Sequence, residues 1–421
     1  MLVDAWLPRA AANRPLARAV NNLKYGELLL EAQRSARQLS ALGVVAGERV
    51  AIILPPGEEF AIYLHAVWLI GAVAVPIDPN TPQAQRAERT RSANFVIDAR
   101  LGGHEDPAAA LVTSHELDAP AVVIFSSGSS GAAKPIELSF GNFWWSAAGS
   151  AVALGLSENE RWLCCLPLSH IGGLSILVRA AIYGTAATVH ERFDSPAVLS
   201  ELRDVDGPTV VSLVPTTLQR LLDAGLENPP ALRWVLLGGG PISAELLERA
   251  AQAAVPVAPS YGMTEACSQI VTGGAPLFCT QVTLGESSEI LVSGPTIAPQ
   301  CRPQLSSGDL GRWGPGGELE IIGRSSDLII SGGENVAPEL VEAVVAAHPA
   351  VADVAVVGRP DAEWGELVTA IVVAKDGQAV SAEQLIEFCR PELAPHERPK
   401  RIEFRDRLGR DGAGKLRRSE L

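Results

Sequence analysis

The sequence from residue 122 to residue 135 reads VVIFSSGSSGAAKP, four apolar residues followed by a loop rich in glycine and serine. The apolar run is typical of a buried strand. Glycines let backbone N–H groups approach a phosphate, serine hydroxyls donate further hydrogen bonds, and a lysine neutralises charge. The stretch therefore predicts a phosphate-binding loop directly after a strand. The candidate phosphate ligands are Ser126, Ser127, Gly128, Ser129, Ser130, Gly131 and Lys134.

Two other interpretations of this loop were weighed. A Walker A loop does not fit, because Ala133 stands where that motif needs its second glycine. Pro135 also stands where that motif has a serine or threonine for Mg²⁺. A flexible glycine–serine linker is the remaining alternative. It is disfavoured because the loop lies between a buried strand and a Lys-Pro pair inside a domain.

Helical and strand patterns alternate on both sides of this loop, which predicts an α/β fold of parallel sheets flanked by helices. The expected helices are 25–42, 60–70 and 216–224, and the expected strands are 49–54, 72–77, 122–125, 209–213 and 235–237. Glycine, proline, serine and threonine are frequent from 273 to 317, which predicts a β-rich subdomain. The tail after Asp327 predicts a small α+β domain. The expected domains are therefore 1–326 and 327–421.

Composition excludes several classes of protein. The 421 residues exceed one domain, and 47% hydrophobic against 19% charged residues excludes disorder. A net charge of −14 excludes nucleic acid as a partner. The six cysteines form no C-x-x-C pair, which argues against structural zinc. No signal-peptide pattern is found, so a cytoplasmic location is expected.

One uncharged stretch of 18 residues, 60–77, just meets the length of a membrane span. Tyr63, His65, Gly71 and Pro76 interrupt it. A buried helix followed by a short strand is the better interpretation, and no membrane span is expected.

Two further polar clusters follow buried strands. Gly238-Gly239-Gly240-Pro241 comes directly after the expected strand 235–237, where ligand-facing loops occur. The stretch 260–269 reads SYGMTEACSQ. In it, Tyr261 could stack on a base, Thr264 could bind phosphate, and Glu265 could hold Mg²⁺ as a hard oxygen ligand.

These three clusters together resemble the adenylate-forming superfamily of acyl-CoA synthetases, luciferases and peptide-synthetase adenylation domains. Further stretches match in the superfamily's order over essentially the whole chain. They are SGDLG at 307–311, GRSSD at 323–327, SGGENV at 331–336 and GRDGAGK at 409–415. The chain is shorter than most relatives, with shortening expected at 100–120 and between Glu265 and Asp309.

The resemblance implies a two-step ligase that uses ATP, Mg²⁺ and coenzyme A. A carboxylate would attack the ATP α-phosphate to give acyl-AMP, and the thiol of coenzyme A would then displace AMP. Lys134 and Lys415 would offset the developing charge, because step one brings two anions together. The resemblance further implies an AMP-binding set: Tyr261, Gly262, Thr264, Gly238, Gly239, Gly240, Asp309 on the ribose, and Arg324.

The resemblance also assigns the moving parts. The small C-terminal domain would rotate about Asp327 between the two steps. Lys415 would then leave, and the loop at Gly332 and Gly333 would approach the thiol. Nine Lys or Arg against three acidic residues lie between 398 and 418, around Lys415. This basic tail is expected near ATP and coenzyme A, with a solvated basic face as the alternative.

Two local stretches, LPLSHIGGL at 166–174 and the continuation ACSQIVT after Glu265, resemble 2-succinylbenzoate–CoA ligases of menaquinone and phylloquinone synthesis. His170, Gly239 and Ser268 are the expected acyl contacts. A CoA ligase for another small aryl or fatty acid remains the alternative. A carrier-loading adenylation enzyme is a second alternative, and the assembly of a homo-oligomer is left open.

Overall fold

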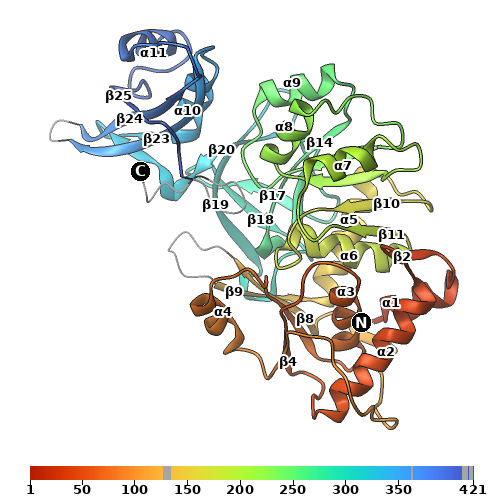
Figure 1. The fold of residues 1–421 in the computed structure, drawn as a ribbon. Helices are drawn as coiled ribbons and strands as arrows, with labels where there is room; N and C mark the ends of the chain where they lie inside the picture. Colours follow the sequence, from red (N-terminus) through yellow and green to blue (C-terminus); the bar gives the residue numbers. More distant parts are fainter. Residues whose placement is uncertain (127–133, 362–363, 410–415, 417–420) are drawn as a thin grey trace. The chain divides into compact units, whose positions relative to one another are not determined.

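The computed structural model describes residues 1–126, 134–361, 364–409, 416 and 421 (Figure 1). The predicted α/β class is confirmed. The chain divides into two compact units. Unit 1 comprises Met1–Gln281 and Val292–Leu305, and unit 2 comprises Val282–Leu291 and Ser306–Leu421.

Unit 1 contains a nine-stranded sheet with the order β16-β15-β14-β13-β12-β10-β11-β2-β3. The six strands from β14 to β2 pair in parallel, and β3, β15 and β16 pair antiparallel at the two edges. The strands are β2 (Arg18–Val20), β3 (Leu23–Lys24), β10 (Arg161–Cys164), β11 (Ala186–Val189), β12 (Val210–Leu213), β13 (Trp234–Leu237), β14 (Val257–Met263), β15 (Ser268–Thr272) and β16 (Ala275–Pro276).

A second sheet in unit 1 has the order β6-β4-β5-β8-β9, with only β8 and β9 antiparallel. Its strands are β4 (Arg49–Ile52), β5 (Val73–Pro76), β6 (Phe95–Ile97), β8 (Pro120–Ser126) and β9 (Lys134–Ser139). A short antiparallel pair, β1 (Leu2–Asp4) and β7 (Ser114–Glu116), stands apart from both sheets.

Both sheets are buried on two faces, as parallel sheets usually are. Successive residues of a strand point to opposite faces, and β10 shows this directly. Trp162 and Cys164 join the core that holds α1, α2, α3, α5 and α6, whereas Leu163 joins the core under α7, α8 and α9. In the second sheet, Val122 and Ile124 of β8 join that same first core. One helical layer therefore fills the space between two sheets.

The helices of unit 1 are α1 (Trp6–Asn13), α2 (Tyr25–Ala41), α3 (Glu58–Leu69), α4 (Gln83–Thr90), α5 (Phe140–Leu154), α6 (Ile171–Tyr183), α7 (Ser195–Leu202), α8 (Pro215–Asp223) and α9 (Ala244–Gln252). The uncharged stretch discussed above forms the buried helix α3 and the strand β5, as predicted. Among the residues that the structure describes, no helix is long and apolar enough to cross a membrane.

Unit 2 contains most of a four-stranded sheet, β17-β18-β19-β20, and a five-stranded sheet in which β25 pairs with β24 beside β22-β21-β24-β23. Its strands are β17 (Gln281–Leu284), β18 (Glu289–Ser293), β19 (Gln304–Trp313), β20 (Leu319–Arg324), β21 (Ile329–Ser331), β22 (Glu334–Val336), β23 (Val351–Asp361), β24 (Gly365–Ala374) and β25 (Arg401–Phe404). Helices α10 (Pro338–Ala346) and α11 (Ala382–Cys389) pack on one face of the five-stranded sheet.

The units divide earlier in the chain than the boundary expected at 326 and 327. The reason is packing between β20 and α10. A Cβ on Gly323 would lie 2.3 Å from the Glu339 carboxylate, so the β-rich segment and the tail helix are in close contact. Both sides of residue 327 therefore belong to unit 2, and the domain boundary proposed from the motif stays a prediction.

Two buried histidines in unit 1 predict acid sensitivity. Burial lowers the pKa of His65 on α3 to about 3, with a smaller contribution from the charge of His115, and lowers that of His115 on β7 to about 4. In the unfolded chain both return to the ordinary value near 6.5, so the unfolded state binds more protons below that pH. We expect the unfolding free energy to fall between pH 6.5 and about 4, by up to about 1.4 kcal/mol per pH unit for each histidine.

Urea unfolding at several pH values checks this. The variant His65→Gln is expected to flatten the pH dependence, whereas a matched change at the exposed His104, His104→Gln, should leave it as it is. Equal slopes for the wild type and His65→Gln would contradict the expectation.

Candidate active site

The carboxyl ends of neighbouring parallel strands bring two of the predicted clusters together. Leu237 at the end of β13 pairs with Pro259 of β14, so the Gly238 loop lies beside Ser260. A Cβ on Gly238 would lie 2.8 Å from the Ser260 carbonyl oxygen, a contact that only glycine avoids. Gly239 has a φ of 79°, in the left-handed region that favours glycine. The glycine loop and the start of the Tyr261 motif are thus adjacent at one sheet edge.

The Tyr261 motif continues into the short 3-10 helix η1 (Thr264–Ala266). Two residues with positive φ, Cys267 at 51° and Ser268 at 95°, then reverse the chain into β15. The Glu265 main-chain oxygen accepts a hydrogen bond from the Ala298 amide at 2.8 Å. A Cβ on Gly262 would lie 1.8 Å from the Ser268 carbonyl oxygen, which explains the glycine at the bulge of this hairpin.

The Glu265 side chain is half-buried at this edge. Among the residues that the structure describes, no group of three His, Cys, Asp or Glu side chains could enclose a metal. Mg²⁺ is usually held by one or two carboxylates together with substrate phosphates. The single carboxylate of Glu265 therefore fits a magnesium ion that arrives with ATP.

The phosphate loop is framed by the hairpin of β8 and β9. Ser126 and Lys134 are paired across the hairpin, and the Ser126 hydroxyl donates to the Lys134 carbonyl oxygen at 3.4 Å. Lys134 is exposed, and its strand β9 neighbours η1, the helix of Glu265. The loop thus ends in an antiparallel strand, which differs from a Walker A loop, where a helix follows. The candidates Ser127, Gly128, Ser129, Ser130 and Gly131 lie outside the described residues.

The expected acyl contacts come from neighbouring elements. His170 is exposed at the N-cap of α6, and Ser268 begins β15, next to Met263 of β14. Helix α6 and strand β15 are neighbours, so the elements next to His170 and Ser268 are adjacent in unit 1.

Unit 2 carries the predicted ribose site. Asp309 on β19 is only 6% exposed and pairs with Arg324 on β20 at 3.0 Å. The Asp309 amide donates to the Ser307 hydroxyl at 3.0 Å, and Gly308 has a φ of 71°. The turn before β19 is therefore fixed by local hydrogen bonds, and Asp309 and Arg324 are neighbours.

The Gly332 loop is a two-residue hairpin turn between β21 and β22. Gly332 and Gly333 have φ values of 63° and 84°, as such turns require. The Gly332 amide donates to the Trp364 carbonyl at 2.8 Å, and a Cβ on Gly332 would lie 3.0 Å from the Trp364 ring. Lys400 places its Nζ 3.9 Å from the centre of that ring. The hairpin therefore rests on an indole that a cation covers.

Two predicted residues remain to be placed. Asp327 ends the 3-10 helix η3 (Ser325–Asp327), where the Ser326 hydroxyl donates to its carboxylate at 3.0 Å. Asp327 lies inside unit 2, and rotation about it stays a prediction. Lys415 lies outside the described residues.

Sequence reasoning missed Arg179, a cation in the middle of the apolar helix α6. It is 2% exposed, and its guanidinium lies 5.4 Å from the centre of the Trp162 ring. One nitrogen donates to the Ser146 hydroxyl at 3.2 Å, and that hydroxyl donates to the Cys267 carbonyl at 2.7 Å. Its Nε has no hydrogen-bond partner among the described residues. An arginine in the apolar run ILVRAAIY was the available signal, since buried charges are usually paired.

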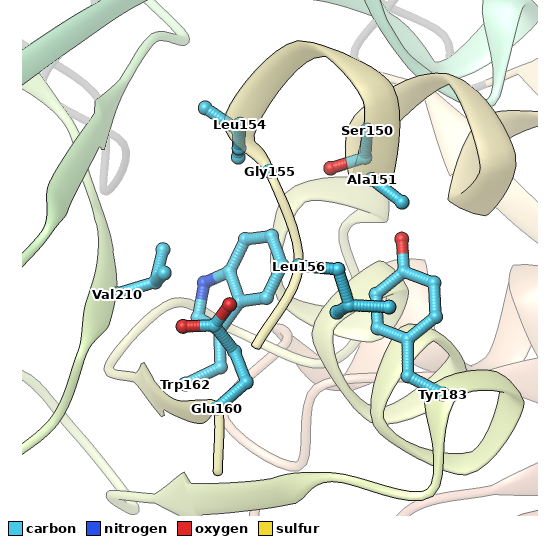
Figure 2. A pocket seen from close by; sticks show the side chains of 9 residues that line it. All are labelled: Ser150, Ala151, Leu154, Gly155, Leu156, Glu160, Trp162, Tyr183 and Val210. Atoms are coloured by element: carbon cyan, nitrogen blue, oxygen red, sulfur yellow. The ribbon is translucent and has the colours of Figure 1, made fainter. Parts of the chain in front are cut away.

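A small cavity in unit 1 is a poor candidate for the site. It lies between α5 and the amino ends of β10 and β12, and is lined by Glu160, Trp162, Tyr183 and Val210 among others (Figure 2). Its volume of about 10 Å³ is room for a single water. Glu160 is already paired with Arg233 at 2.5 Å. This cavity is therefore structural, at the sheet edge opposite the glycine loop.

Comparison with known proteins gives family matches over most of the chain. Residues 7–325 match the AMP-binding enzyme family, and residues 340–415 match the AMP-binding enzyme C-terminal domain. The chain is 35% identical to a 2-succinylbenzoate–CoA ligase from Bacillus licheniformis, with 100% of both chains covered.

Solved structures agree. An o-succinylbenzoate CoA synthetase from Bacillus subtilis in complex with its acyl-adenylate intermediate has a TM-score of 0.90 at 32% identity. That match covers 100% of this chain and 98% of the solved chain. The same enzyme in complex with ATP and a magnesium ion has a TM-score of 0.91 at 32% identity, with 100% of both chains covered. The resemblance expected from the motifs is confirmed: the chain belongs to the AMP-binding enzyme family.

Proposed function

We propose that this chain is an ATP-dependent acid–CoA ligase that converts 2-succinylbenzoate into its CoA thioester through an acyl-AMP intermediate. The observation that carries the proposal is the joining of the Gly238 loop, the Tyr261 motif and the Lys134 strand around Glu265 in unit 1. Two relatives, of which the match covers 97% or more, are named 2-succinylbenzoate–CoA ligases. ATP and coenzyme A are its cosubstrates, and Mg²⁺ is its metal ion. A place in menaquinone or phylloquinone synthesis and a cytoplasmic location are parts of the same proposal.

The first step joins two anions, and this chain's residues reduce their repulsion. An oxygen of the substrate carboxylate attacks the ATP α-phosphorus, and pyrophosphate leaves with the electrons of the broken P–O bond. Lys134 and Lys415 offset the negative charge that develops, and Thr264 donates to a phosphate oxygen. The Asp309 carboxylate accepts hydrogen bonds from the ribose hydroxyls. Magnesium, held by Glu265, supplies further charge neutralisation on the phosphates.

The second step forms the thioester and uses a different segment of unit 2, the turn at Gly332. The thiolate of coenzyme A attacks the acyl carbon, and AMP leaves with the electrons of the broken C–O bond. The two-glycine turn at Gly332 and Gly333 has no side chains, so a pantetheine thiol can approach its backbone closely. Tyr261 stacks on the adenine and so holds the acyl-AMP in the site until the thiolate attacks.

Arg179 supports a substrate acid that has a second carboxylate. Only one of the two carboxylates of 2-succinylbenzoate is adenylated, and the other remains charged. Burial lowers the pKa of the Arg179 guanidinium, because a desolvated cation lacks compensating charge. A carboxylate from the substrate supplies that charge. Arg179 reaches the Cys267 carbonyl through Ser146, which places it behind the loop of Glu265. A dicarboxylic acid therefore suits this site better than a benzoate or a fatty acid.

An acid panel tests the substrate. AMP release in the presence of coenzyme A is measured with 2-succinylbenzoate, benzoate and hexanoate. We expect kcat/KM for 2-succinylbenzoate to exceed the others by about 100-fold or more, because a site built around a buried cation rejects acids that leave it unpaired. Comparable values for benzoate or hexanoate would favour the alternative of a general aryl or fatty acid ligase. Acyl-AMP formation without CoA thioester would favour carrier loading.

The role of Lys415 is tested by separating the half-reactions. Lys415→Ala is expected to slow acyl-AMP formation by about 100-fold or more, because it removes a charge that stabilises the transition state. Thioester formation from pre-made acyl-AMP should stay close to wild type. The matched control is Lys375→Ala, at an exposed lysine of unit 2 outside the motifs. Full acyl-AMP formation by Lys415→Ala would show the assignment to be wrong.

Arg179 is tested by calorimetric binding of the acid. Arg179→Met keeps an unbranched stem that reaches as far as the arginine Nε and removes the charge, and we expect 2-succinylbenzoate to bind about 30-fold more weakly, roughly 2 kcal/mol. Arg179→Lys keeps the charge and should recover part of the affinity, and ATP should bind all three proteins equally. Unchanged affinity for the acid in a folded Arg179→Met would assign this arginine to the core alone.

A further inference from the structure

The segment that follows β25, called the C-terminal tail below, is attached through three leucines to one face of the five-stranded sheet. Alternate residues of β23 and β24 form that face, and Ala355 and Ile371 on it are fully buried. Leu408, Leu416 and Leu421 pack against them. Helices α10 and α11 cover the opposite face. The leucines of the tail therefore close the side of the sheet that the helices leave open.

A polar network fixes the same tail. Arg359 near the end of β23 donates to the main-chain oxygen of Leu421 at 2.9 Å and to the Glu403 carboxylate of β25 at 3.2 Å. Arg405 donates to the same Leu421 oxygen at 3.2 Å. Arg359 and Glu403 are about one-third and one-quarter exposed, so this is a partly shielded pair. Two arginines thus hold one oxygen of the tail.

The attached residues are neighbours of Lys415 in the sequence. Leu416, which follows Lys415 directly, is attached to the sheet face, and consecutive Cα atoms are about 3.8 Å apart. Leu421 attaches the tail again five residues further on. Fixing the backbone of one residue costs about 1–2 kcal/mol in entropy. Attachment before ATP arrives removes part of that loss from the reaction, as preorganisation does.

We propose that Arg359 is a positioning residue for acyl-AMP formation: it fixes Leu421, and with it the tail that carries Lys415. The proposal rests on the proposed function, because it needs Lys415 to act in the first step. Arg359 touches neither substrate nor nucleotide in this role. Its removal should therefore lower the rate of one half-reaction without changing the affinity for ATP.

The experiment measures both half-reactions of the full chain. In Arg359→Met, we expect kcat for acyl-AMP formation to fall five- to tenfold with KM for ATP unchanged, and thioester formation from pre-made acyl-AMP to change less than twofold. Arg359→Lys, which can still donate to Leu421, should recover part of the loss. The matched control is Arg390→Met, because Arg390 also pairs with a glutamate of unit 2, Glu387, at 3.0 Å, and lies outside the basic tail. It should leave both half-reactions unchanged.

An equal loss in both half-reactions, or no loss in either, would overturn the proposal. If Arg359→Met does not fold, Leu421→Ala removes the apolar attachment instead and is expected to show the same one-sided loss. Lys415→Ala is measured in parallel. Should Lys415→Ala retain acyl-AMP formation, the proposed function of Lys415 fails. Should Lys415→Ala lose it while the Arg359 and Leu421 variants do not, only the present inference fails.

Discussion

The parallel pairing of β10, β12, β13 and β14 is the constraint on which the rest of unit 1 depends. Parallel strands end at one edge of a sheet, so the segments that follow them collect there. The Gly238 loop and the Tyr261 motif meet for this reason, and the stretch that leads to His170 follows β10 at the same edge. Parallel pairing also demands cover on both faces. The layer of α3, α5 and α6 meets that demand for two sheets at once.

Buried charges near the two ends of the parallel strands of this sheet are compensated differently. At the amino edge, Glu160 is 3% exposed and is compensated by Arg233 and the Thr209 hydroxyl. The two charges of this pair balance each other within the fold, although the Arg233 Nε has no hydrogen-bond partner among the described residues. Behind the opposite edge, Arg179 has only neutral partners, Ser146 and the Trp162 ring, among the described residues. A buried cation without a charged partner lowers stability unless an anion joins it, and this contrast in charge compensation supports the proposed binding role of Arg179.

Local patterns were enough to predict several central strands and the place of the glycine loop after β13. The run before Ser126 became β8 because four apolar residues can only be buried together, and the glycine loop followed β13 as expected. The apolar run around Arg179 signals a buried cation, but its surroundings could not be predicted, because Ser146 and Cys267 are distant in sequence. The packing of β20 against α10 could not be predicted from local patterns either. It depends on a close contact between Gly323, in the 323–327 motif, and Glu339 of α10, which are 16 residues apart in the sequence.

Unit 2 attaches its two functional segments by independent means. The Gly332 turn rests on Trp364, which Lys400 covers, and the tail of Lys415 is held by Leu416, Leu421 and Arg359. The two attachments have no residue in common, although both use the sheet of β23 and β24. Mutations at residues without shared partners usually have additive effects. If the proposed roles of Lys415 and the Gly332 turn hold, mutations at the two attachments should therefore alter the two half-reactions separately.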